Sequence, residues 1–199
     1  MSGDRGDPLL FLRKFLRHGK RVASFWESSR YMAAAMCRAI DPGRPQTILE
    51  LGAGAGAVTR TAQSLMHVDS RLLAVEIDPD FAALLAGRCP RAEVLCCDVA
   101  ELGERLPALG VGAIDVVINC LPTPSLPKAV NLAVGETVAR FAPDSPVSQL
   151  TIMPLVYWPM YRRLYEQVRF QFVAANVPPG GVYHCRRLRP DFRDHLPGH

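Results

Sequence analysis

Apolar residues in the middle of the chain come in short, nearly continuous runs. A run of this kind predicts a strand that is buried on both faces of a sheet. Between the early runs, apolar residues recur at helical spacing, which predicts helices over Ala57–Met66 and 80–88. The alternation of strand and helix predicts an α/β fold, with a mainly parallel sheet covered by helices on both faces. The predicted strands are Thr47–Leu51, Leu72–Ile77, Glu93–Cys97, Ile114–Cys120 and Val147–Ile152.

The two flanks of this central pattern carry further elements. Residues 28–40 have the composition of a helix, with Ser28 or Ser29 as the expected N-cap, and Asp41-Pro42-Gly43 would end it. On the other side, residues 158–169 are expected to be helical. Two later stretches, Phe170–Asn176 and Val182–Leu188, are expected to pair as a terminal hairpin.

The N-terminal residues 9–18 predict an amphipathic helix. Four large apolar residues recur at helical spacing and basic residues lie between them. Such a helix can lie in the interface of a bilayer or pack on the protein's own core, and the segment by itself favours neither. We therefore divide the chain into residues 1–40, a helical segment for membrane contact or a lid, and residues 41–199, the main domain. The residues concerned are Phe11, Leu12, Phe15 and Leu16, with Arg13, Lys14 and Arg17 between them.

Composition and charge narrow the class of protein. The chain has 199 residues, of which 49% are hydrophobic and 21% charged, as expected for one globular domain. No apolar run reaches the roughly 20 residues that span a bilayer, and there is no clear secretory pattern, so we expect a cytoplasmic protein. The net charge is only +4, but basic residues cluster in residues 8–23 and 186–193, which indicates an anionic partner. None of the six cysteines forms a CxxC pair, so we expect buried free thiols and no metal site.

A glycine-rich turn follows the first predicted strand, in the sequence Ile48-Leu49-Glu50-Leu51-Gly52-Ala53-Gly54-Ala55-Gly56. Glycines allow a sharp turn and the close approach of a ligand, and the following helix start offers free N–H groups. Glu76 stands at the end of the next strand, where an acid can bind both hydroxyls of a ribose. Asp98 follows the third strand, within reach of an adenine amine. The two acids and the turn together predict a site for an adenosine-containing cofactor.

The acid before the turn distinguishes between cofactors. Glu50 would repel a pyrophosphate, whereas it suits the cationic methionine part of S-adenosylmethionine (SAM). The whole arrangement resembles the class I SAM-dependent methyltransferases, which have a Rossmann-like fold. The resemblance implies SAM as cofactor and S-adenosylhomocysteine as product. It also implies a set of cofactor-binding positions, in which we include the neighbours of the strand-end acids: Glu50, Gly52, Gly54, Gly56, Glu76, Ile77, Asp98, Val99 and Asn119.

The fourth strand ends in a proline-rich loop at a position where open α/β sheets bind ligands. Asn119 and the carbonyl group of Leu121, followed by Pro122, are our candidates for the residues that face the transferred methyl group. An Asn-x-x-Pro sequence here is loosely similar to the amino-group methyltransferases, which include the rRNA adenine dimethylases. The alternative interpretation is a loop without a chemical role.

Over nearly the whole chain, the sequence resembles a narrower family, the small soluble bacterial phosphatidylethanolamine N-methyltransferases. The resemblance implies a basic amphipathic helix that binds anionic membrane, and transfer of one to three methyl groups to a lipid headgroup amine. It rests on residues 11–17, Ser28-Ser29-Arg30, the glycine-rich turn, the loop at 120–127, and Asn176-Val177-Pro178-Pro179 followed by Val182 and Arg186-Arg187.

Two departures from that family put the substrate in doubt. Glu27 stands where the family usually has proline, and Ile152-Met153 stand where it often has Tyr-Gly. Ornithine lipids, which also carry a primary amine, are therefore an alternative substrate. An aromatic wall for the methylated amine could come from Tyr31, Tyr157 and Tyr183 instead.

Three functions stay open at this point. The first is a lipid N-methyltransferase on the inner face of the cytoplasmic membrane. Its candidate membrane contacts are Phe11, Arg13, Lys14, Phe15 and Arg17. The second is an rRNA adenine dimethylase-like enzyme, for which 199 residues leave little room for a separate RNA-binding domain. The third is a non-catalytic SAM-binding module. We expect an anionic membrane and an aminolipid as partners, no nucleic acid, and a monomer.

Overall fold

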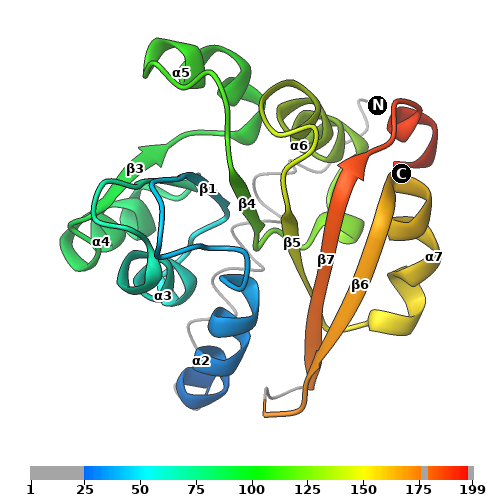
Figure 1. Ribbon diagram of the computed structural model, residues 1–199, viewed down its shortest axis with the longest axis horizontal. Coiled ribbons are helices and arrows are strands. Elements are labelled where there is room, and N and C mark those ends of the chain that lie inside the picture. Colours follow the sequence, from blue (N-terminus) through cyan, green and yellow to red (C-terminus); the bar gives the residue numbers. More distant parts are fainter. Residues whose placement is uncertain (1–24, 176–178, 197–199) are drawn as a thin grey trace, which may run out of the picture.

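The computed structural model describes residues 25–175 and 179–196, which are built around one seven-stranded sheet (Figure 1). The strand order is β3-β2-β1-β4-β5-β7-β6. The first five strands are parallel, and β7 is antiparallel to both β5 and β6. The predicted α/β fold with a mainly parallel sheet is confirmed. The strands are β1 Thr47–Leu51, β2 Arg71–Glu76, β3 Ala92–Cys96, β4 Val116–Asn119, β5 Val147–Thr151, β6 Tyr165–Val173 and β7 Gly180–Leu188.

Helices cover both faces of the sheet. One face carries α2 Phe25–Met36, α3 Ala57–Leu65 and α4 Pro79–Arg88. The other face carries α5 Leu102–Ala108, α6 Lys128–Phe141 and α7 Pro154–Leu164, together with the short 3-10 helix η1 Val99–Glu101. Two more 3-10 turns are η2 Thr123–Ser125, between β4 and α6, and η3 Phe192–His195, after β7. Among the described residues, no helix is long and apolar enough to cross a membrane.

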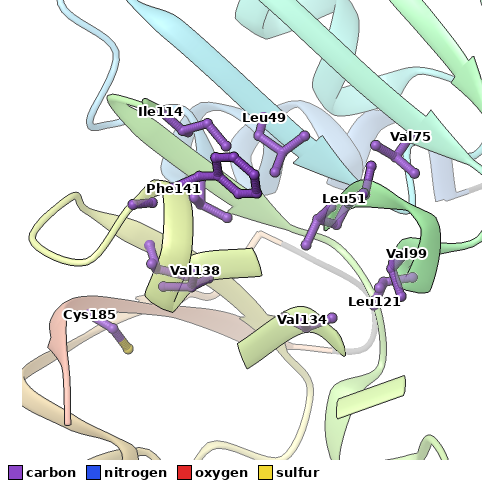
Figure 2. Close-up of a cluster of buried hydrophobic side chains, with 14 of the residues drawn as sticks. Leu49, Leu51, Val75, Val99, Ile114, Leu121, Val134, Val138, Phe141 and Cys185 are labelled. Atoms are coloured by element: carbon purple, nitrogen blue, oxygen red, sulfur yellow. The ribbon is translucent and has the colours of Figure 1, made fainter. Parts of the chain in front are cut away.

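The alternation of side chains along β1 divides the core between the two faces. Leu49 and Leu51 point into the larger cluster, which includes Phe141 of α6 and Cys185 of β7 (Figure 2). Ile48, which precedes Leu49 and points the other way in the pleat, packs on the opposite side with α2 and α3. A fully buried side chain of this size contributes about 1.5–3 kcal/mol, so a continuous apolar strand stabilises both layers at once.

Several predicted elements differ from the observed ones. α2 begins at Phe25, so Ser28 and Ser29 lie inside the helix and the prediction that one of them caps it is wrong. The predicted helix over 158–169 is wrong in its second half, because α7 ends at Leu164 and β6 follows at once. The predicted terminal hairpin is confirmed, with a longer first strand. The predicted helix 9–18, with its membrane-contact residues, lies outside the described residues.

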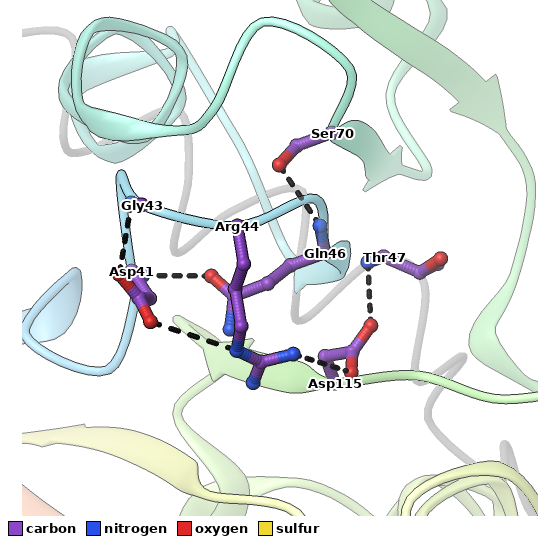
Figure 3. Close-up of polar contacts among 7 residues, drawn as sticks. All are labelled: Asp41, Gly43, Arg44, Gln46, Thr47, Ser70 and Asp115. Carbon is purple, nitrogen blue, oxygen red and sulfur yellow. Dashed lines mark hydrogen bonds and ion pairs between the residues drawn. The ribbon is translucent and has the colours of Figure 1, made fainter.

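Polar contacts hold the start of β1 at the edge of the sheet away from the glycine-rich turn (Figure 3). The Thr47 backbone N–H donates to Asp115 at 2.8 Å, and the Gln46 N–H donates to the Ser70 hydroxyl at 3.0 Å. Arg44 pairs with both Asp41 and Asp115 at 3.5 Å. These contacts join the chain before β1 to the starts of β2 and β4, which places the ends of those strands side by side at the opposite edge.

Candidate active site

The carboxyl ends of β1, β2 and β4 meet at one edge of the sheet. Leu51, the last residue of β1, is in register with Val75 on one side and Asn119 on the other. The backbone N–H groups of Gly52 and Ala53 both donate to the Val75 carbonyl, at 2.9 and 3.0 Å. The glycine-rich turn is therefore fastened to β2 before the chain enters α3. This is the edge where open parallel sheets bind ligands.

Gly52 and Gly54 of the turn are required to be glycine for different physical reasons. Gly52 has φ +73°, and a Cβ there would come within 2.7 Å of Leu121 in the loop after β4. Gly54 has φ +54°, but a Cβ there would meet nothing within 4 Å. Both conformations favour glycine over residues with a side chain. Gly52 thus permits close packing of two loops, whereas Gly54 faces open space in which a ligand can approach the backbone.

Glu50 is a fully buried carboxylate under the turn, on the same face as α2 and α3. Neither of its oxygens, nor the hydroxyl of its neighbour Thr59, has a hydrogen-bond partner among the described residues. Burial raises the pKa of Glu50 to about 7; the Thr59 side chain opposes this rise and the Glu76 charge adds to it. A buried acid without a partner is costly, and a nearby cation would compensate it. The ammonium group of a methionine fits this requirement.

Glu76 is also buried, but its carboxylate is engaged with the backbone. One oxygen accepts from the Gly54 N–H at 2.7 Å and the other from the Asp78 N–H at 2.9 Å. The side chain thus holds the middle of the glycine-rich turn, and each oxygen keeps a further lone pair for a hydroxyl donor. Ile77 follows as a half-buried residue. The structure places Glu76 beside the glycine-rich turn, in a supporting role that the sequence pattern did not indicate, and its contact with ribose hydroxyls stays a prediction.

Asp98 follows β3 and caps η1. Its side chain accepts from the Ala100 N–H at 2.9 Å, and the Glu101 side chain accepts from the Asp98 N–H at 3.0 Å. This reciprocal capping box holds the carboxylate at the same edge of the sheet as Glu76. Asp98 is half-buried, whereas Val99 is buried in the main core. A contact from Asp98 to an adenine amine stays a prediction.

The loop after β4 is organised by a buried amide network. The Asn119 side-chain N–H₂ donates to Gln149 at 2.7 Å and to the Thr123 hydroxyl at 3.1 Å, and its oxygen accepts from the Leu121 N–H at 3.1 Å. Gln149 in turn donates to the Leu121 carbonyl at 3.0 Å. Asn119 therefore positions the loop, and the Leu121 carbonyl already has donors within the chain. Contacts of Asn119, Leu121 or Pro122 with the methyl group stay predictions.

Gln149 is the residue of this network that sequence reasoning missed. It lies in the middle of β5 and is 2% exposed. A long polar side chain at the centre of a predicted buried strand was the available signal, because a buried amide must find partners.

The three tyrosines proposed for an aromatic wall lie in different environments. Tyr183 is fully buried, packs on the rings of Tyr161 at 4.7 Å and Phe170 at 5.4 Å, and donates to the Pro154 carbonyl. Its predicted place in an accessible wall is therefore wrong, because β7 turns it into the core. Tyr31 is 48% exposed and pairs with Arg30, while Tyr157 is half-buried in α7.

Tyr161 is a further polar residue near the candidate site that the sequence pattern did not single out. Its ring is buried beside Tyr183, and its hydroxyl has no hydrogen-bond partner among the described residues. Burial raises the pKa of Tyr161 well above its usual value, and the Thr123 side chain opposes this rise. The hydroxyl is thus neutral and next to the loop that Asn119 organises.

Comparison with known proteins was made at the level of sequence and of fold. No family model matches the chain. An ornithine lipid N-methyltransferase of Singulisphaera acidiphila is 38% identical over 190 residues, which are 94% of this chain and 99% of that enzyme. The ribosomal RNA small subunit methyltransferase A of Bordetella petrii is 37% identical over only 98 residues, 46% of this chain and 36% of that enzyme.

Solved structures show the same fold at low identity. The 1,6-didemethyltoxoflavin-N1-methyltransferase of Burkholderia thailandensis, solved with S-adenosylhomocysteine, has a TM-score of 0.64 and 19% identity, covering 95% of this chain and 94% of its own. The fibrillarin of Aeropyrum pernix, solved with bound SAM, has a TM-score of 0.57 and 18% identity, covering 80% of this chain and 76% of its own. These structural similarities show that the chain has the methyltransferase fold.

Proposed function

Since this chain belongs to the family of class I SAM-dependent N-methyltransferases that includes the Singulisphaera ornithine lipid enzyme, we propose that it methylates the headgroup amine of a membrane aminolipid. Ornithine lipid is the first candidate substrate. The proposal rests on the sequence identity to that relative, which extends along almost the whole length of both chains and so beyond the cofactor-binding residues. The ribosomal RNA methyltransferases match over about half of this chain and about a third of their own length, so they support an RNA substrate less well.

The residues of the site suit SAM. The buried, unpaired carboxylate of Glu50 would hold the methionine ammonium, directly or through water, and Gly54 leaves room for the ligand beside the backbone. Glu76 and Asp98 would take the ribose hydroxyls and the adenine amine. When bound, SAM supplies an electrophilic methyl group on a sulfonium. The protein's contribution is then to hold a neutral amine in line with that methyl group and to exclude water.

We assign the residues around the loop after β4 to the amine. Asn119, Thr123 and Gln149 hold the loop in one conformation, so that Leu121 and Pro122 present a fixed surface. The half-buried ring of Tyr157 would hold the methylated ammonium through cation–π contacts of about 0.5–2 kcal/mol.

An exposed apolar ridge supports action at a membrane surface. The ridge consists of four residues at the end of β5 and the start of α7: Ile152 at 54% exposure, Met153 at 47%, Leu155 at 89% and Val156 at 59%. Thr151, just before it, lies two residues beyond the position paired with Asn119, so the ridge borders the candidate active site. Apolar side chains gathered beside a site are typical of membrane or partner contact.

The partners that we propose follow from this arrangement. The ridge and the basic, apolar residues Phe11, Arg13, Lys14, Phe15 and Arg17 would together contact an anionic leaflet on the cytoplasmic side. We propose no nucleic-acid substrate, and we propose that the protein acts as a monomer.

The test is methyl transfer from labelled SAM to mixed vesicles, with the lipid products separated by chromatography. Ornithine lipid, phosphatidylethanolamine and ribosomal RNA are offered side by side. We expect more label in ornithine lipid than in the other two substrates. Label mainly in phosphatidylethanolamine would mean that the protein methylates an aminolipid with a different headgroup. Label only in RNA, or none in a protein that binds SAM by calorimetry, would overturn the proposal. Glu76→Gln protein serves as the control for cofactor-dependent label.

A further inference from the structure

The outer face of the β6–β7 hairpin carries a cleft of about 530 Å³, on the side of the sheet where α2 lies. Three of its lining residues are arginines, one is a histidine, and none is acidic: Arg38, Arg169, Arg186 and His184, with Gln167 and Gln171 among the rest. The arginines come from separate segments of the chain, so their meeting is a product of the fold. The cleft lies on elements other than those that form the glycine-rich turn.

Strand register places the charges close together. Arg169 of β6 is directly opposite His184 of β7, and Arg186 is opposite Gln167. Arg169 and Arg186 are therefore diagonal neighbours on one face, at a spacing of roughly 7–8 Å between backbones. Arg38, two residues after α2, reaches the same face and donates to the Gln171 side chain at 3.4 Å. Like charges at such spacing repel each other unless an anion lies between them.

The arginines of the cleft have no carboxylate partner among the described residues, unlike five arginines elsewhere on the surface. Elsewhere, five arginines pair with carboxylates: Arg44, Arg71, Arg105, Arg187 and Arg193. Arg187 follows Arg186 directly, but it points to the other side of the strand and meets Asp144 and Glu166. Within residues 25–175 and 179–196, Arg38, Arg169 and Arg186 form no ion pair with a carboxylate. Apart from the hydrogen bond from Arg38 to Gln171, their fork-shaped guanidinium groups keep donors with which to bind an anion.

The floor of the cleft is a hydrogen-bonded line of side chains. Gln171 Oε1 accepts from Arg38, so the His184 Nε2 atom at 3.0 Å from the same oxygen carries a proton. His184 Nδ1 then accepts from the Ser148 hydroxyl at 3.3 Å. Burial, followed by the Arg38 charge, lowers the pKa of His184, so the ring is neutral at pH 7. The ring is fixed in place and its protonation reports on the charge around it.

We propose that this cleft is a binding site for a phosphate group, held by Arg38, Arg169 and Arg186. Phosphate fits better than a single carboxylate, because it offers several acceptor oxygens to three guanidinium groups. The group can come from free phosphate or from the headgroup of an anionic phospholipid. A lipid source would place a second headgroup contact on this enzyme, apart from the site of methyl transfer.

The test follows the His184 ring by NMR in the full-length protein, with His184→Gln protein to identify its resonance. The probes are inorganic phosphate and monomeric dihexanoyl phosphatidylglycerol. Bound phosphate places negative charge near the ring, so we expect saturable changes and a titration midpoint that moves to higher pH. A response to inorganic phosphate alone indicates a free-phosphate site, and a tighter response to the lipid indicates a headgroup site. Both results support the proposal.

Variants decide whether the arginines of the cleft are responsible. Arg169→Gln with Arg186→Gln is expected to weaken phosphate binding at least ten-fold, whereas Arg162→Gln with Arg163→Gln, on the exposed last turn of α7, should bind as the unchanged protein does. If circular dichroism shows that the double variant does not fold, the single variant Arg38→Gln replaces it and should also weaken phosphate binding. An unresponsive His184 ring in the unchanged protein, or an equal loss in the α7 variant, would overturn the proposal. None of these measurements depends on methyl transfer.

Discussion

The side-chain oxygen of Gln149 accepts a hydrogen bond from the Asn119 amide at 2.7 Å, across two neighbouring strands. Both residues are 2% exposed, and they share Thr123 and the backbone of Leu121 as further partners. In a buried network of this kind each member satisfies the others, so the loss of one leaves polar groups without partners. The pair thus connects the position of the loop after β4 to the middle of β5.

Substitution of this pair should reveal strong coupling. Asn119→Ala and Gln149→Ala are each expected to lower the free energy of unfolding by about 1–3 kcal/mol, because each leaves a buried group unsatisfied. The double variant should lose less than the sum, by about 0.5–3 kcal/mol. Urea unfolding of the four proteins measures this. Additive losses would show that the two side chains act independently.

Glu50 should give the cofactor-free protein a specific dependence of stability on pH. Burial raises the pKa of Glu50 from 4.5 to about 7, so the folded protein binds more protons than the unfolded chain between these values. Stability then falls as pH rises through this window, by up to about 3 kcal/mol at ~1.4 kcal/mol per pH unit. Glu50→Gln should remove this contribution in urea unfolding at pH 5 and pH 7.5. The exposed Glu104→Gln is the matched control.

The same carboxylate should couple SAM binding to a proton. A cationic ammonium beside Glu50 favours the ionised form, so binding near pH 7 should release a proton and affinity should rise between pH 6 and pH 8. Calorimetry in buffers of different ionisation enthalpy measures the release. Glu50→Gln protein should bind more weakly and without this release. Proton release that persists in Glu50→Gln protein would assign it to another group.

Glu76→Gln should separate cofactor binding from folding. The amide keeps the size of the side chain but loses one of the two acceptors that hold the Gly54 and Asp78 N–H groups, so a stability loss of about 1–3 kcal/mol is expected. SAM affinity should fall at least ten-fold by calorimetry. Asp80→Asn, at an exposed acid in the first turn of α4, should bind SAM normally. Unchanged affinity in Glu76→Gln protein would contradict the assigned ribose site.

The apolar ridge should contribute to vesicle binding. Leu155→Glu with Val156→Glu places two charges on a surface that we propose to enter the lipid interface, so sedimentation with anionic vesicles should drop several-fold while SAM binding persists. Val68→Glu, at a residue 77% exposed between α3 and β2, should sediment like the unchanged protein. Equal sedimentation of all three proteins would exclude the ridge as a membrane contact.

The parallel half of the fold and the cofactor motif could be predicted because their signals are local. Apolar runs such as Thr47–Leu51 are buried on both faces, and the glycine-rich turn and Glu76 lie at strand ends that the pattern alone locates. The helices α5 and α6 were not predicted, and the end of α7 was misplaced. The residues after Leu164 are compatible with both helix and strand, and their pairing with β7 makes them a strand.

By itself, the sequence determined the five parallel strands, the first helices between them, the glycine-rich turn, Glu50 in β1 and Glu76 at the end of β2, since each depends on residues near one another in the chain. Only the tertiary structure decided which distant residues meet. It buried Tyr183 instead of exposing it, joined Asn119 to Gln149, and separated Arg186 from Arg187 on opposite sides of β7. The physical reason is that side-chain direction in a strand follows its pleat and its partner strands, so contacts between strands depend on a register that no local pattern contains.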